Sequence, residues 1–168
     1  RRAGLGERGP LWIMARSQTA GRGRMGREWA APRGALTATL LFAPRCEPAE
    51  APLYGFTAAL AVATMIAEAA PEAPRPTLKW PNDVLIGGRK VAGVLLESGG
   101  GARVDWLAVG IGVNLGAAPP AESMRAGGLR PTSVAAESGV VLAPEAALDA
   151  LAAGIHALFA RHTEEGFE

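Results

Sequence analysis

Residues 78–97 read Leu78-Lys-Trp-Pro-Asn-Asp-Val-Leu-Ile-Gly-Gly-Arg-Lys-Val-Ala-Gly-Val-Leu-Leu-Glu97. Two apolar runs, 84–86 and 91–97, flank a Gly87-Gly88 pair. Runs of this length on either side of a two-glycine turn are typical of a β-hairpin, because glycine tolerates the positive φ that tight hairpin turns need. The sequence therefore predicts two antiparallel strands joined at Gly87-Gly88.

Further strand-like runs lie on both sides of this hairpin. Residues 78–80 precede it, and residues 104–113 follow it after a turn predicted at 98–102. Nearer the N-terminus, residues 11–15 and 35–43 are also short, apolar and β-branched or leucine-rich. These lengths suit buried strands better than helices.

Three segments predict helices. The alanine-rich residues 51–70 predict a helix that ends before the proline-containing turn at 71–76. Residues 144–161 predict a long amphipathic helix with proline in its first turn, and residues 132–138 a short one with Thr132 as N-cap. Together, strands and helices predict an α/β or α+β domain whose sheet is mixed in direction and flanked by helices.

Composition narrows the class of protein. At 168 residues and 49% hydrophobic content, the chain is long enough for one domain with a sizeable core. A net charge of +1 and 5% aromatic residues argue against a dedicated nucleic-acid binder, so no nucleic-acid partner is expected.

Cysteine use and apolar run lengths bear on location. Cys46 is the only cysteine, which excludes a disulfide framework and a thiolate zinc site. We expect no apolar run to reach the length that spans a membrane. The arginine-rich start lacks the apolar segment of a signal peptide. The expectation is a soluble, cytoplasmic protein without a membrane partner.

A glycine–arginine loop lies between the first two predicted strands. Residues 18–29 read Gln18-Thr-Ala-Gly-Arg-Gly-Arg-Met-Gly-Arg-Glu-Trp29. Glycine lets backbone N–H groups approach a ligand, and each guanidinium offers a planar fork of donors suited to phosphate or carboxylate. Residues 1–33 carry eight arginines against two glutamates, a local charge of +6. The loop thus suits a small-anion clamp, with a nucleic-acid contact or a solvated turn as the alternatives.

Two further motifs carry polar groups near strand ends. The Gly87-Gly88 hairpin should return Lys90 toward Asn82 and Asp83, although Asn-Asp after proline is also a common turn. Residues 109–115, Val-Gly-Ile-Gly-Val-Asn-Leu, place two glycines inside a strand, which weakens it unless something must approach its backbone. Neither a dinucleotide fingerprint nor a Walker sequence is present.

In this order and spacing, the loop, the Lys-Trp-Pro-Asn-Asp-Val hairpin and the Gly-x-Gly-x-Asn strand closely resemble the biotin protein ligases. The similarity covers nearly the whole chain and continues through Pro131-Thr-Ser133. It implies a two-step reaction in which biotin and Mg-ATP give biotinyl-5′-adenylate and pyrophosphate. The biotinyl group then passes to a lysine of a biotin carboxyl carrier protein.

The resemblance also implies site residues. The catalytic group is Lys90, Arg24 and Asp83. The biotin-binding group is Gln18, Gly21, Arg22, Gly23, Arg24, Lys90 and Gly93. The ATP- or adenylate-binding group is Arg22, Arg24, Arg27, Trp29, Asn82 and Asn114. No motif binds a metal directly, and Asp83 is the candidate to meet Mg²⁺ carried by ATP.

The chain departs from the family pattern at its ends. Nothing before Leu11 matches the segment that contacts the biotin ureido ring, and the small C-terminal β-barrel has no counterpart. We therefore expect residues 1–168 to be a catalytic domain with an incomplete N-terminus. Three rival functions remain, a lipoate or octanoate protein ligase or transferase, a catalytically silent ligase-like domain, and a nucleic-acid module. The family also allows a homodimer.

Overall fold

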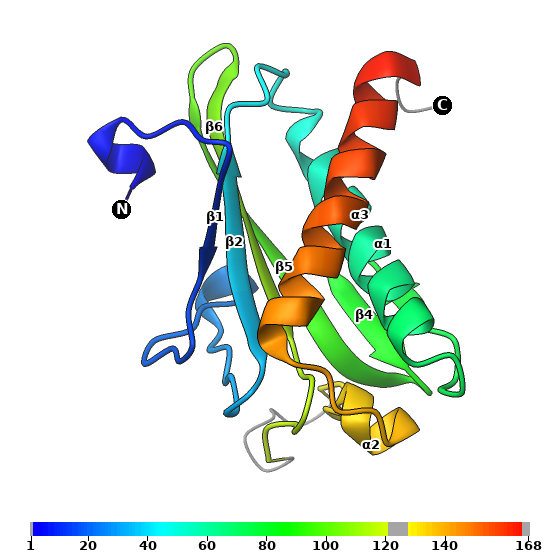
Figure 1. The fold of residues 1–168 in the computed structure, drawn as a ribbon. Helices are drawn as coiled ribbons and strands as arrows, with labels where there is room; N and C mark the ends of the chain where they lie inside the picture. The colour runs from blue at the N-terminus through cyan, green and yellow to red at the C-terminus, as the bar shows by residue number, and fades with distance from the viewer. Residues whose placement is uncertain (1, 121–127, 166–168) are drawn as a thin grey trace.

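In a computed structural model, residues 2–120 and 128–165 are described, and their strands form one six-stranded sheet (Figure 1). The strands are β1 (Leu11–Met14), β2 (Leu36–Phe42), β3 (Thr77–Lys79), β4 (Asp83–Ile86), β5 (Arg89–Gly100) and β6 (Val104–Val113). The helices are η1 (Ala3–Leu5), η2 (Arg24–Gly26), α1 (Ala51–Ala69), α2 (Val134–Ser138) and α3 (Pro144–Glu165). Along the sheet the strands follow the order β1-β2-β6-β5-β4-β3.

Every ladder between these strands is antiparallel. The expected class, a β-sheet with helices, is confirmed, but the expected mixture of strand directions is wrong. The physical reason lies in the connections. Tight turns join β3 to β4, β4 to β5 and β5 to β6, and a tight turn can join only antiparallel strands. Helix α1 connects β2 to β3, which are not neighbours in the sheet.

The predicted hairpin is present, and its second strand is longer than expected. Gly87 and Gly88 both have positive φ, +55° and +76°, as a two-residue hairpin turn requires. Strand β5 continues to Gly100, so the turn predicted at 98–102 begins later. Gly99 faces Trp106, and a Cβ on Gly99 would lie 2.5 Å from Trp106 Nε1. Gly99, one of the glycines that suggested a turn, instead makes room for this indole.

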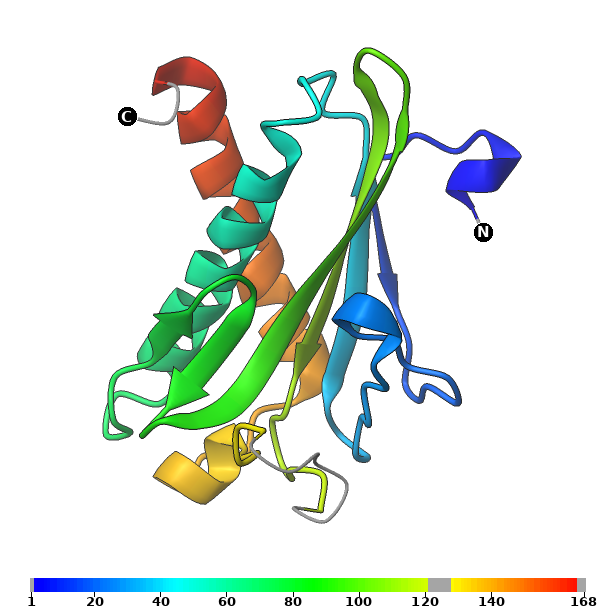
Figure 2. The same ribbon diagram turned by 180° about the vertical axis from the view of Figure 1, so that it is seen from behind.

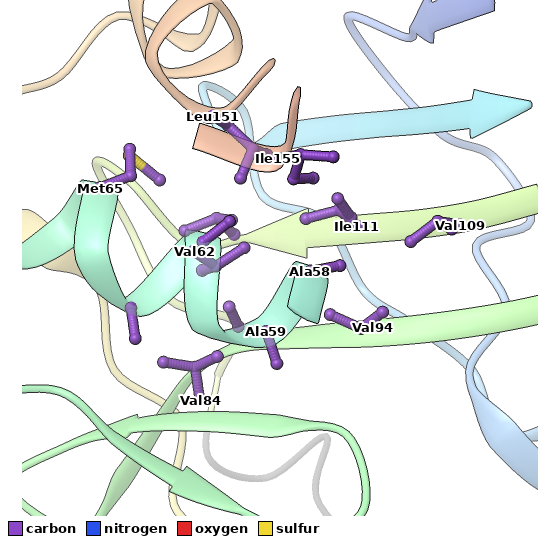
Figure 3. Close-up of a cluster of buried hydrophobic side chains, with 14 of the residues drawn as sticks. Ala58, Ala59, Val62, Met65, Val84, Val94, Val109, Ile111, Leu151 and Ile155 are labelled. Atoms are coloured by element: carbon purple, nitrogen blue, oxygen red, sulfur yellow. The ribbon is translucent and has the colours of Figure 1, made fainter. Parts of the chain in front are cut away.

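Helices α1 and α3 cover one face of the sheet, and the loop between β1 and β2 lies on the opposite face (Figures 1 and 2). Strand β6 supplies Val109, Ile111 and Val113 to the helix side, all at most 2% exposed. Figure 3 shows Val109 and Ile111 among the side chains of α1 and α3, including Val62 and Leu151. Most of the core thus lies between the sheet and these two helices, and Val134 of α2 adds to it.

The expectation that no apolar run could span a membrane needs correction. Helix α1 is the one helix among the described residues whose length and composition would suffice. Just over half of its apolar stretch is buried in this fold. It packs against both α3 and the sheet, as the core helix of the domain does.

The short helix α2 begins later than expected, and a different residue caps it. Ser133, not Thr132, is the N-cap, because the Ser133 hydroxyl accepts from the Ala136 N–H at 3.2 Å. The Thr132 hydroxyl instead donates to the Glu137 carboxylate. Helix α3 begins at Pro144 as predicted.

Candidate active site

Glycines form the floor of the candidate site on the sheet face that the helices leave uncovered. A Cβ on Gly112 of β6 would lie 2.4 Å from the Trp29 indole. A Cβ on Gly93 of β5 would lie 3.4 Å from both Trp29 Cζ3 and Lys90 Nζ. The indole therefore rests on bare backbone, which agrees with the interpretation that strand glycines serve a close approach.

Backbone hydrogen bonds fold the glycine–arginine loop onto itself. The Trp29 N–H donates to Gly21 O at 2.9 Å, and the Gly23 N–H donates to Arg27 O at 2.7 Å. At the tip, Met25 adopts a left-handed φ of +58° and is 87% exposed. A Cβ on Gly21 would meet Trp29 O at 2.2 Å, so only glycine fits this close pairing.

The predicted anion-binding arginines have different surroundings. Arg22 lies 3.5 Å from the Glu97 carboxylate, which projects from β5 on the same sheet face. Within the described residues, Arg24 and Arg27 make no salt bridge. The loop therefore holds two guanidinium groups whose charge no carboxylate in residues 2–120 or 128–165 offsets through a salt bridge.

Lys90 and Asp83 meet, as the hairpin predicts. Lys90 Nζ lies 2.6 Å from Asp83 Oδ1, and the two side chains are only 22% and 16% exposed. The same ammonium lies 5.5 Å from the centroid of the Trp29 ring. Reduced contact with water strengthens such interactions, so this ammonium is held between a carboxylate and an aromatic face.

The two predicted asparagines differ in what they offer a ligand. The Asn82 carboxamide donates to Val94 O at 2.9 Å, which supports the turn between β3 and β4. Asn114, 2% exposed, donates to Thr132 O at 3.0 Å. Its Oδ1 is a buried acceptor, and Trp29 Nε1 a buried donor, with no hydrogen-bond partner among the described residues. Such orphan groups are costly to bury, so both favour a ligand at the end of β6.

A cavity of about 280 Å³ adjoins the glycine floor. Three of the predicted site residues, Gln18, Gly21 and Trp29, line it. Pro119 and Pro120 close it from the far side, and nothing in the sequence pattern pointed to them. Lys90 and Gly93 do not line this cavity. They contact the Trp29 indole, which therefore separates the cavity from the lysine.

Among the described residues, few side chains of this site could bind a metal ion. The part of the chain that the structure describes contains no group of three or more His, Cys, Asp or Glu residues arranged to hold a metal ion. Asp83 supplies one carboxylate beside the lysine. One or two carboxylates completed by phosphate oxygens are a usual environment for Mg²⁺, so the donor set fits an ion that arrives with a nucleotide.

Sequence reasoning missed two carboxylates that contact site elements. Glu97 ends the apolar run of the hairpin, and this charged residue at a strand end was a usable signal. Glu137 lies in α2, and its side chain is 5% exposed and bonded to Arg89. A glutamate in a short helix carries no pattern that would have singled it out.

Comparison with known proteins identifies the family of this chain. The sequence profile of the Biotin/lipoate A/B protein ligase family matches residues 6–114. The chain is 48% identical over 145 residues to a biotin–[acetyl-CoA-carboxylase] ligase of Paracoccus denitrificans, covering 86% of this chain and 60% of that protein. The chain thus spans about three fifths of that relative's length.

Solved structures of ligases share the fold. Biotin protein ligase from Aquifex aeolicus, in complex with biotin and ATP, matches with a TM-score of 0.77 and 29% identity over 92% of this chain and 62% of that one. The ligase from Leishmania major in complex with biotinyl-5-AMP gives 0.75 and 26%, covering 92% of this chain and 66% of that one. The fold expected from the resemblance is confirmed.

Proposed function

This chain belongs to the biotin/lipoate A/B protein ligase family, and we propose on that premise that its protein activates biotin with ATP and transfers it to a carrier-domain lysine. The observation that carries the proposal is a convergence of groups on the glycine floor. The Trp29 indole, at the end of the glycine–arginine loop, rests on Gly93 and Gly112. Lys90, ion-paired with Asp83, lies beside the same indole. Fixed cations around a floor of bare backbone suit two anionic substrates that must be brought together.

In the first step, a carboxylate oxygen of biotin attacks the α-phosphorus of ATP. The bond to the pyrophosphate oxygen breaks, which yields biotinyl-5′-adenylate and pyrophosphate. Lys90 would bridge the carboxylate and the α-phosphate and stabilise the charge that grows there. Arg22 and Arg24 would hold the anions from the loop, and Gln18 would bond biotin from within the cavity.

The nucleotide would bind to the two buried polar groups near the end of β6 that have no hydrogen-bond partner among the described residues. Trp29 offers a ring face and an unpaired N–H, and Asn114 offers an unpaired oxygen. We propose that the adenine lies against Trp29 and that Asn114 bonds the nucleotide. Mg²⁺ bound with ATP would neutralise phosphate charge, with Asp83 as the nearest carboxylate.

In the second step, the amine of the carrier lysine attacks the acyl carbon of the adenylate. An amide forms, AMP leaves, and the amine releases its proton. The glycine–arginine loop would close over the mixed anhydride between the two steps and exclude water that would hydrolyse it. The enzyme would act in the cytoplasm, and its protein partner would be a biotin carboxyl carrier domain.

One assay separates this function from its rivals. Full-length protein incubated with biotin, α-labelled ATP and Mg²⁺ should form labelled biotinyl-adenylate and then biotinylate an apo carrier domain. Lipoic and octanoic acids serve as competing substrates in parallel reactions. Adenylates of these acids without one of biotin would identify a lipoate- or octanoate-type enzyme. Biotin binding measured by calorimetry, without any adenylate, would identify a silent ligase-like domain.

A further inference from the structure

Glu137 is a buried charge outside the residues that the reaction uses. Its side chain, in helix α2, is 5% exposed. Burying a carboxylate is costly unless it is paired, and an apolar residue would fill the same space without that cost. The two partners of this carboxylate therefore indicate what the buried charge is for.

Both partners flank Lys90. Arg89, the residue before it in β5, donates to Glu137 Oε2 at 2.7 Å. The Thr132 hydroxyl donates to Glu137 Oε1. Thr132 in turn donates its backbone N–H to Lys90 O at 2.8 Å. The carboxylate thus ties together the segments on both sides of the Lys90 peptide.

The segment that Glu137 holds is paired with the start of β5. The Lys90 N–H donates to Arg130 O at 2.8 Å, so residues 130–132 run parallel to Lys90 and form a short bridge. The segment also reaches the end of β6, because Asn114 donates its side-chain N–H to Thr132 O. Displacing Thr132 would therefore shift the backbone that carries the lysine and the nucleotide-side asparagine together.

We propose that Glu137 is a positioning residue that, through Arg89 and Thr132, fixes the backbone of Lys90 so that its ammonium stays at the reacting groups. This inference rests on the proposed function for its kinetic consequence only. The two contacts of Glu137, with Arg89 and with Thr132, are here called the Glu137 clamp, and they are a property of the fold. Because small misplacements of a catalytic group are costly, loosening the clamp should lower kcat by a larger factor than it changes either KM.

Two kinds of variant separate positioning from simple support of the fold. Glu137→Gln removes the charge that holds Arg89 and keeps the shape. Thr132→Val removes the hydroxyl that donates to Glu137, whereas Thr132→Ser keeps a hydroxyl at this position. Glu7→Gln is the matched control, because it removes the carboxylate partner of Arg2 at 3.0 Å in an exposed pair at the N-terminal end.

The kinetic arm measures biotinyl-adenylate formation. Glu137→Gln and Thr132→Val should lower kcat roughly 10- to 100-fold and change each KM by a smaller factor. Thr132→Ser and Glu7→Gln should stay close to the unmodified protein. A uniform loss of folded protein that lowers every parameter together, with no rescue by serine, would reduce Glu137 to structural support.

The exchange arm does not depend on activity. Within residues 1–168 the lysines are Lys79 and Lys90. Selective ¹⁵N-lysine labelling, with these two backbone amides assigned, therefore reports on each of them. Hydrogen exchange of the Lys90 amide, which is bonded to Arg130 O, should accelerate at least roughly tenfold relative to Lys79 in Glu137→Gln and Thr132→Val. An unchanged Lys90-to-Lys79 ratio in the Thr132→Val protein would overturn the proposal even if Glu137→Gln failed to fold. A faster Lys90 amide in a protein that never adenylates biotin would instead count against the proposed function alone.

Discussion

The two faces of strand β6 carry different residues for different purposes. Val109, Ile111 and Val113 point to the helices and are at most 2% exposed. Gly110 and Gly112 alternate with them on the opposite face, where the Trp29 indole rests on Gly112. One strand therefore supplies the core with its large side chains and the candidate site with its lack of them. Stability and ligand binding are therefore separable on β6, because they use alternate residues of the strand.

The largest expected effect lies on the helix side of β6. Ile111→Ala should lower the free energy of unfolding by about 2–5 kcal/mol, because a fully packed position leaves a cavity when truncated. Chemical denaturation measures the change. Ile13→Ala on β1, where the side chain is 36% exposed, is the control and should cost far less. Equal losses for the two variants would break the distinction between faces.

The next effect belongs to catalysis on the open face. Lys90→Ala should remove about 2–4 kcal/mol of transition-state stabilisation, roughly a 30- to 1,000-fold drop in adenylate formation. Lys79→Ala, which changes the other lysine of the chain, should leave the rate nearly unchanged. Circular dichroism establishes that each variant is folded. Near-normal adenylation by Lys90→Ala would remove the lysine from the reaction.

A methyl group added to the glycine floor tests the close approach directly. Gly112→Ala should displace the Trp29 indole and cost about 1 kcal/mol of stability, because its Cβ would lie 2.4 Å from the ring. Gly110→Ala, on the same face of the same strand, meets only ordinary contacts from 3.5 Å outward. Steady-state kinetics should show a raised KM for ATP in the first variant and not in the second. The reverse order would contradict the assignment of Gly112 to the floor.

The smallest expected effect concerns the Trp29 indole that rests on the glycine floor. Trp29→Ala should raise the KM for ATP roughly 2- to 12-fold, which corresponds to the loss of about 0.5–1.5 kcal/mol of stacking. The KM for biotin should change less, because stacking is lost on one substrate only. Both constants come from initial rates of adenylate formation. Equal changes in the two would make Trp29 a residue that packs the base of the loop.

Local patterns predicted the parts of the fold that depend on neighbouring residues. The bounds of β6 and the start of α3 agree with the periodicity, and the Gly87-Gly88 turn follows from glycine's access to positive φ. The meeting of Lys90 with Asp83 also follows from local geometry, because one hairpin carries both residues. The family and its fold were equally accessible from the motifs.

Errors arose where a side-chain contact overrides the local backbone pattern. The cap of α2 was assigned to Thr132, whose hydroxyl is instead engaged by the buried Glu137 carboxylate. The end of β5 was placed too early, because Gly99 accommodates Trp106 within the strand pair and does not belong to the turn. The partner of Thr132 lies inside the predicted helix, five residues further on, whereas Trp106 lies outside the 98–102 window from which the turn was predicted.

The sequence by itself determined the strands, the main helices, the hairpin that pairs Lys90 with Asp83, and the family. Only the tertiary structure decided the antiparallel order of the sheet, the placement of Trp29 on Gly112 and the clamp from Glu137 to Arg89 across 48 residues. Turns and periodicity depend on the conformational preferences of adjacent residues, which a sequence states directly. Contacts between distant segments depend on how whole elements pack around one core. This packing brings the glycine–arginine loop onto the glycine floor and α2 beside the start of β5.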